Sequence, residues 1–260
     1  MEQFQRVHIV GCPRSGTTLL LELMGNCFDF SERTPFEFSI FRQFATQSGA
    51  VLSKHPTDIL HVQPLLESDP TLHVIHILRD PRAVVASRHK AIRGYFSNYR
   101  IWKDCERASR ALLGHPRFLQ IRYEELVRDP DGVQQQILRR FRFLVFKHVF
   151  SEFSKYARPV REAEEALNGL RAVDTASLGK WHLHLSRVKA QLQEFPSLQS
   201  DLEQYGYERD DSWQQMLEAV APQRFPCRYG NRAPLFKRWE KNVRFYFKTR
   251  RYLRQLQTGT

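Results

Sequence analysis

Long apolar runs are missing from this sequence of 260 residues. The run at 19–21 is broken at once by Glu22, and no stretch approaches the roughly 20 apolar residues that a membrane span requires. The first predicted strand is reached by Val7, so we expect no signal peptide. These absences predict a cytoplasmic protein, with contact to a membrane at most peripheral.

Paired cysteines and metal-ligand patterns are also missing. The four cysteines show neither C-x-x-C pairing nor histidine partners at zinc spacing: Cys12, Cys27, Cys105 and Cys227. This usage is typical of a reducing compartment. We therefore expect no disulfide framework and no metal site.

Acidic residues are scarce toward the carboxyl terminus. The net charge is +12, and from Arg224 onward eleven Lys/Arg stand against one acid, Glu240. Large apolar residues recur there at helical spacing: Phe236, Trp239, Val243, Tyr246 and Phe247. A basic amphipathic helix is typical of a membrane-surface, polyanion or partner-helix contact, and equally of a terminal helix docked by its aromatic residues. We expect residues 211–260 to form a basic, aromatic-rich helical extension, and we expect no specific nucleic-acid partner.

The rest of the chain has a globular composition, with 42% hydrophobic and 12% aromatic residues. Short apolar runs predict strands at 6–11, 50–53, 72–78 and 117–123. Helical spacing predicts helices after Gly16 and at 57–68, 82–93, 99–113, 135–156, 184–195 and 197–207, with a polar loop at 158–180. Strands that alternate with helices indicate a parallel sheet covered on both faces. The sequence predicts one α/β domain, residues 1–210, of the P-loop-type three-layer class with a helical C-terminal part.

A phosphate-binding loop is the strongest local signal. Residues 11–18 read GCPRSGTT, between the first strand and a helix, which is the context such a loop requires. Helix N-terminal N–H groups and Arg14 provide an anion site. Thr17 stands where nucleotide triphosphatases have the lysine that bridges the terminal phosphates. Asp80 is the one strand-end aspartate that a magnesium ion could use, and it follows Arg79. The loop therefore predicts phosphate binding but not Mg-ATP hydrolysis.

Two segments together resemble the sulfotransferases that use 3′-phosphoadenosine 5′-phosphosulfate (PAPS). These are PRSGTT after the first strand and LRDPRAVVAS after a later one. The pattern is most similar to the bacterial and tyrosylprotein branch, in which arginine replaces the loop lysine of the cytosolic enzymes. The resemblance runs from about Val7 to Tyr207. It implies a PAPS-dependent sulfotransferase that releases 3′,5′-adenosine bisphosphate (PAP) and needs no metal.

The resemblance also implies donor-binding residues. The loop would hold the 5′-phosphosulfate through Arg14, Ser15, Gly16, Thr17 and Thr18. The strand-end arginine and a serine two turns on would hold the 3′-phosphate, and these match Arg79 and Ser87, with Arg82 as a second cation. IRYEEL resembles the element whose tyrosine, Tyr123, approaches adenine. DTASLGKW resembles the segment over the donor, which provides Lys180 and, as a weaker match, Ser177.

Catalytic roles follow from the same resemblance. SKHP resembles the K-x-P segment whose lysine, Lys54, would balance charge on the bridging oxygen together with Arg14. The acceptor hydroxyl must lose a proton, so a general base is needed. In this branch the base is a glutamate after the first helix. Glu37 fits best, with Glu32 next and His55 as a third alternative.

The acceptor stays open among glycan, lipid, tyrosine and small-molecule hydroxyls, and the basic composition would suit an acidic glycan. Two other functions remain in view. A P-loop small-molecule kinase would need Mg-ATP, against which the missing lysine argues. A non-catalytic nucleotide or polyanion binder would have lost the transferase site.

Overall fold

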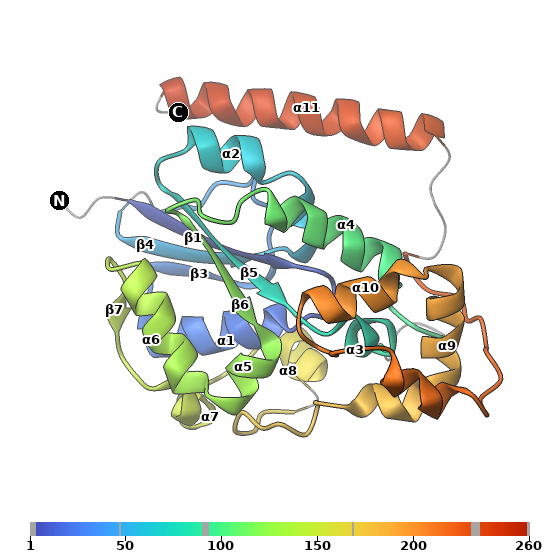
Figure 1. The fold of residues 1–260 in the computed structure, drawn as a ribbon. Coiled ribbons are helices and arrows are strands. Elements are labelled where there is room, and N and C mark those ends of the chain that lie inside the picture. Colours follow the sequence, from blue (N-terminus) through green and yellow to red (C-terminus); the bar gives the residue numbers. More distant parts are fainter. Residues whose placement is uncertain (1–3, 47, 90–93, 168, 230–234, 259–260) are drawn as a thin grey trace.

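Five parallel strands form the central sheet of the computed structural model, which describes residues 4–46, 48–89, 94–167, 169–229 and 235–258 (Figure 1). The strand order is β3-β4-β1-β5-β6, from β3 (Glu32–Glu37) and β4 (Ala50–Lys54) through β1 (Gln5–Gly11) to β5 (Leu72–Leu78) and β6 (Phe118–Arg122). The four predicted strands are confirmed to within one residue at each end. Their registers align the carboxyl ends, for example Ile9 with Lys54 and Leu78 with Arg122.

Alternate residues of β5 face opposite layers, which explains its continuous apolar sequence. Leu72 and Val74 belong to one buried cluster, whereas Ile75 and Ile77 belong to the other. The second cluster lies under α1 (Thr17–Cys27), α5 (Tyr123–Arg128) and α6 (Pro130–Arg140). The first lies under α2 (Gln63–Ser68), α4 (Tyr99–Arg110), α9 (Leu185–Glu194) and α10 (Ser197–Gln204). The predicted three-layer α/β fold is confirmed.

The edge strand β3 and a two-stranded sheet were not predicted. Pro35 and charged residues make β3 look like a loop in sequence, but proline is tolerated in an edge strand, where its missing N–H faces no neighbour. The small sheet pairs β2 (Phe28–Asp29) with β7 (Val145–Phe146). Strand β3 is too polar, and β2 and β7 are too short, to show the alternation of apolar and polar residues that predicts a strand.

Three helix predictions were wrong in extent. The segment 135–156 is helical only to Arg140. The chain then turns back, and Phe141, Phe150 and Phe153 all pack in one core cluster. The rest of the segment contains the 3₁₀ turn η2 (Phe150–Glu152) and α7 (Phe153–Tyr156). The segment 57–68 splits into η1 (Pro56–Leu60) and α2, which places Pro64 in a first turn. The helix predicted at 82–93 is the shorter α3 (Pro81–Val85), because Arg88 already forms a β-bridge with Tyr95. Residues 90–93 lie outside the described part of the chain.

The predicted loop at 158–180 contains a short helix, α8 (Arg161–Leu167), and the 3₁₀ turn η3 (Lys180–His184) begins at its end. Beyond residue 210, η4 (Ser212–Leu217) and α11 (Leu235–Thr258) follow. Trp213 and Tyr252 from these elements are buried in the same cluster as residues of β1 and β5. In Figure 1, α11 lies across α2 and α4 on the outer side of that layer.

Candidate active site

The loop between β1 and α1 has the backbone of an anion cradle. Arg14 has a φ of 77° and Gly16 a φ of 108°, so the chain turns through left-handed conformations just before α1. A Cβ atom at Gly16 would overlap the ring of Tyr123, and one at Gly11 would lie 2.8 Å from the carbonyl oxygen of Ile77. No side chain caps α1. Its first N–H groups therefore remain available to a ligand.

A cavity of about 780 Å³ opens at the carboxyl ends of the strands. Eleven of the sequence-predicted residues line it: Arg14, Gly16, Thr17, Thr18, Glu37, Lys54, Arg79, Ser87, Tyr123, Ser177 and Lys180. Seven Lys/Arg and four Asp/Glu side chains are in its lining, so the lining carries net positive charge. The tertiary fold thus brings together motifs that lie up to about 165 residues apart.

Arg79 forms one wall of the cavity. Its Nη1 donates to the carbonyl oxygen of Arg14 at 3.0 Å, and its guanidinium carbon lies 3.9 Å from the ring centre of Tyr123. The Tyr123 hydroxyl in turn lies 2.7 Å from Oγ of Ser177. Arg79 Nε is buried without a hydrogen-bond partner among the described residues. An unpaired buried donor is costly, so this atom is available to an acceptor oxygen of a ligand.

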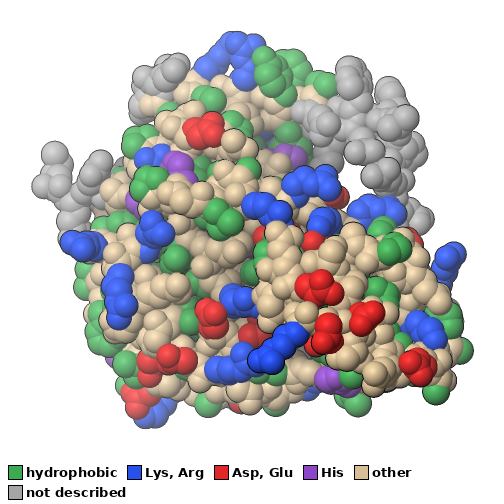
Figure 2. Space-filling view, viewed as in Figure 1, with side chains coloured by type: hydrophobic (Ala, Val, Ile, Leu, Met, Phe, Trp, Pro, Cys, Tyr) green, Lys and Arg blue, Asp and Glu red, His purple; other side chains and the backbone are tan. Residues whose placement is uncertain are grey.

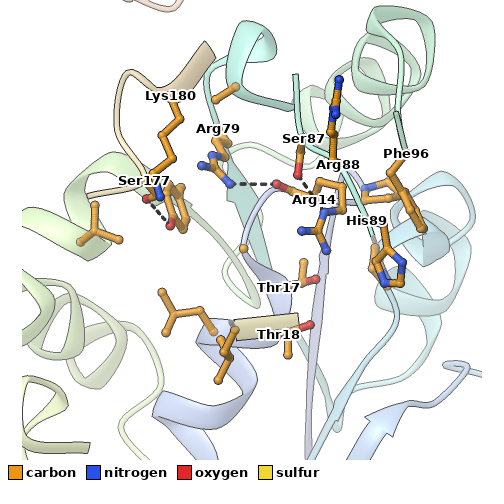
Figure 3. Close-up of a pocket in the computed structure, with 18 of the residues that line it drawn as sticks. Arg14, Thr17, Thr18, Arg79, Ser87, Arg88, His89, Phe96, Ser177 and Lys180 are labelled. Carbon is orange, nitrogen blue, oxygen red and sulfur yellow. Dashed lines mark hydrogen bonds between the residues drawn. The ribbon is translucent and has the colours of Figure 1, made fainter. Parts of the chain in front are cut away.

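A second wall, beside Arg79, is built around Ser87 and Phe96. Arg14 Nε donates to Ser87 Oγ at 2.9 Å, and the backbone N–H of Phe96 donates to the carbonyl oxygen of Ser87 at 3.2 Å. In Figure 3, Arg14 lies between this wall and the wall that carries Ser177 and Lys180. Burial and the positive charge of Arg79 lower the pKa of Arg14. A cation held in this way is prepared for an anionic ligand.

Sequence reasoning missed three residues of this wall. Arg88 and His89 follow Ser87 and line the cavity, and Arg228 reaches it from the C-terminal segment. The guanidinium of Arg228 lies 5.4 Å from the ring centre of Phe96. Arg88 could have been found as the neighbour of a motif serine. Arg228 offered no signal beyond the charge of the tail, because its approach depends on the pairing of Tyr95 with Cys227.

Lys54 ends β4 at the floor of the cavity, with a side chain that is 1% exposed. Its Nζ lies 3.4 Å from Thr18 Oγ1, 3.5 Å from Glu37 Oε1 and 4.6 Å from the ring centre of Phe36. Burial lowers the pKa of Lys54, and the charge of Glu37 opposes that shift. The ammonium group of Lys54 is thus buried beside the N-terminus of α1, where the loop ends.

Glu37 ends β3, and its side chain is 43% exposed in the cavity mouth. Its other carboxylate oxygen lies 4.0 Å from Nε2 of His55. The Nδ1 atom of His55 lies 2.8 Å from Asp58, which also accepts the backbone N–H of Ile40 at 2.7 Å. Burial lowers the pKa of His55, but Asp58 and then Glu37 more than offset this, so the pKa is raised overall. Asp58 was not predicted, and it orients the histidine beside the glutamate.

The remaining sequence candidates lie outside the cavity lining. Glu32 accepts the backbone N–H groups of Ala45 and Thr46, each at 3.1 Å. Arg82 pairs with Asp80 at 2.8 Å and also with Glu208. His55 contacts the site through Glu37, and Ser15 lies beneath the loop with its side chain fully buried. Within the described residues, no three His, Cys, Asp or Glu side chains cluster in a way that could hold a metal ion.

Fold and site together define a P-loop-like α/β protein with a cavity of net positive charge at the carboxyl ends of its strands. The sulfotransferase domain from the curacin biosynthetic pathway has a similar fold, with a TM-score of 0.56 and 18% identity over 80% of this chain and 99% of that domain. Residues 27–143 match the model of the Sulfotransferase family. These matches confirm the predicted resemblance to the sulfotransferases, in the fold and in the sequence of residues 27–143.

Two curated relatives are omega-hydroxy-beta-dihydromenaquinone-9 sulfotransferases Stf3, from Mycobacterium bovis and Mycobacterium tuberculosis. Each is 30% identical over 123 residues, covering 39% of this chain and 30% of the relative. The match thus spans less than a third of the length of these relatives.

Proposed function

We propose that this protein is a sulfotransferase that transfers a sulfuryl group from PAPS to a hydroxyl acceptor. The observation that carries the proposal is one cavity whose lining joins the phosphate loop, the Arg79–Ser87 pair and the Lys54–Glu37 pair. The loop and the Arg79–Ser87 pair are two anion-binding elements, which suit a donor with separate 3′-phosphate and 5′-phosphosulfate groups, and the Lys54–Glu37 pair lies beside them. The family match supports the same chemistry.

Donor binding uses both walls of the cavity. The loop N–H groups, Arg14 and Thr17 hold the 5′ end, where a helix N-terminus favours negative charge. Ser87 and the unpaired Nε of Arg79 hold the 3′-phosphate, and Arg228 adds charge beside them. The Tyr123 ring, already stacked on Arg79, provides a flat surface for the adenine.

The donor supplies a sulfuryl group activated by its bond to phosphate. Lys54 and Arg14 balance the negative charge that grows on the bridging oxygen as that bond breaks. Glu37, 3.5 Å from Lys54, removes the proton of the attacking acceptor hydroxyl. His55, held by Asp58, lies next to Glu37 and positions its carboxylate. Most of the acceleration then comes from alignment and fixed charge, as in phosphoryl transfer.

A kinase is less well supported. The loop lacks its lysine, and the strand-end Asp80 is already engaged, since it caps α3 through the N–H of Arg82 and pairs with the guanidinium of the same residue. A carboxylate held in this way is not free to bind magnesium. The non-catalytic alternative keeps the donor-binding residues and differs from the proposal in the catalytic roles of Glu37, Lys54 and Arg14.

The acceptor is a hydroxyl compound that enters beside Glu37 and Phe36. The excess of cations in the lining suits the anionic donor and also an acidic glycan acceptor. A lipid hydroxyl is a second acceptor class, because the curated relatives are named for a menaquinone derivative. Parallel assays with a sulfated glycan and an isoprenoid alcohol, at equal donor concentration, separate the two by kcat/KM.

Thermal denaturation tests the donor site. PAP at a hundred times its Kd is expected to stabilise the protein by about 2.7 kcal/mol, whereas ADP and Mg-ATP stabilise it less. Arg79→Ala is expected to remove most of the stabilisation by PAP, because it removes the half-buried guanidinium beside the loop. The control Arg139→Ala changes an exposed arginine on α6 and leaves the PAP effect intact. Stabilisation by Mg-ATP alone would contradict the proposal and favour the kinase.

A further inference from the structure

Helix α11 has one docked face and one solvent face. Phe245 stacks on His61 with ring centres 3.4 Å apart. Tyr252 is buried, and its hydroxyl donates to Asp69 and accepts from Arg6. These contacts recur at seven-residue spacing, which keeps them on one side of a helix. These contacts therefore fix which side of α11 packs on the protein and which side faces solvent.

The outer face combines large apolar side chains with cations. Phe247 is 63% exposed and Tyr246 is 56% exposed. Exposed basic residues surround them, namely Arg244, Lys248, Arg250, Arg251 and Arg254. The one acid in this part of the chain, Glu240, pairs with Arg244 at 2.6 Å. In Figure 2, basic and hydrophobic side chains lie side by side at the top of the molecule, where Figure 1 shows α11.

We propose that this outer face docks on the surface of an anionic lipid bilayer. Basic residues beside aromatic ones characterise helices that lie in the membrane interface. Tyrosine and phenylalanine partition into the headgroup region, while arginine and lysine pair with anionic lipids. Positions 244, 247 and 251 share one stripe of the helix, so Phe247 enters the interface between two arginines.

The exposed aromatics favour a bilayer over a soluble polyanion. A polyanionic chain would need the cations alone, whereas Phe247 gains from contact with hydrocarbon and has no use in a purely ionic contact. None of the described helices combines the length and apolar character needed to cross a bilayer. The contact is thus a surface one, carried by α11. It does not depend on the proposed sulfuryl transfer.

Flotation of the full chain with lipid vesicles tests the proposal. We expect binding to vesicles of phosphatidylcholine with about 30% phosphatidylserine, and at least tenfold weaker binding to phosphatidylcholine alone. Raising the salt from about 0.1 to 0.5 M is expected to weaken binding at least tenfold, because exposed charges are screened. Phe247→Ser is expected to weaken it about tenfold by removing the inserted ring. The double variant R244Q/R251Q is expected to weaken it roughly 30-fold.

Matched controls use the far side of the molecule. Phe146→Ser removes an exposed ring on β7, and R139Q/R140Q removes two exposed charges on α6; neither is expected to change vesicle binding. Unchanged melting temperatures show that each variant folds. Three results would overturn the proposal: equal binding to neutral vesicles, binding to heparin without binding to vesicles, or full vesicle binding by Phe247→Ser. If the unchanged protein binds vesicles but does not bind PAP, the result counts against the sulfotransferase proposal alone.

Discussion

Replacing Glu37 by glutamine is expected to lower the rate of sulfuryl transfer by about 10²–10⁴-fold, while PAP binds as in the unchanged protein. Glutamine keeps the shape of the side chain and its contact with Lys54, but it cannot accept the proton of the acceptor hydroxyl. In the proposed complex the donor lies against the loop and Arg79, so its affinity is not expected to depend on the carboxylate. Transfer of labelled sulfate and thermal denaturation with PAP measure the two effects separately.

Glu32→Gln is the matched control for this experiment. Glu32 begins the same strand, lies outside the cavity lining and accepts two backbone N–H groups. A glutamine there keeps an acceptor oxygen, so we expect transfer to change by less than about threefold. Normal transfer by Glu37→Gln together with its loss in His55→Gln would assign the base to the histidine. Normal transfer in both variants would contradict the proposed base altogether.

Replacing Asp58 by alanine is expected to lower the free energy of unfolding by about 3 kcal/mol. Asp58 is buried in η1, which packs on β1; it pairs with His55, accepts the N–H of Ile40 and lies 3.3 Å from Nε2 of the fully buried His8. Removing the carboxylate leaves these donors buried without a partner. Urea denaturation at neutral pH measures the loss. An Asp104→Ala control, in which an exposed carboxylate of α4 is removed, is expected to cost less than about 0.5 kcal/mol.

The same carboxylate makes stability depend on pH. Burial by itself would raise the pKa of Asp58, but His55 and His8 hold it well below the usual range. Its folded pKa therefore lies below the unfolded value of about 3.9, and the stabilisation is present above that pH and is lost as the pH falls toward the folded pKa. Asp58→Asn should flatten the decline in stability below about pH 4. An acid limb identical to that of the unchanged protein would contradict the proposed linkage.

Several features of the fold were predictable because they are local. The strand-loop-helix around GCPRSGTT and the apolar run of β5 are visible as hydrophobic periodicity and turn-forming residues, which depend only on neighbouring positions in the sequence. Edge strand β3 was missed because its partners stabilise it, not its own sequence. The break after Arg140 was missed for a similar reason, since three phenylalanines that share a helical pattern in sequence turn back into one core.

The same distinction between local pattern and tertiary contact applies to the candidate site. The sequence by itself identified the candidate phosphate-binding residues, since glycine spacing, hydroxyls and strand-end arginines are visible in it. Only the tertiary structure decided that Glu37 meets Lys54, that Asp58 orients His55, and that Arg228 reaches the wall of Ser87 from the far end of the chain. The physical reason is distance along the chain: parallel strands align their carboxyl ends across the sheet, and this alignment depends on contacts between segments that no local pattern encodes.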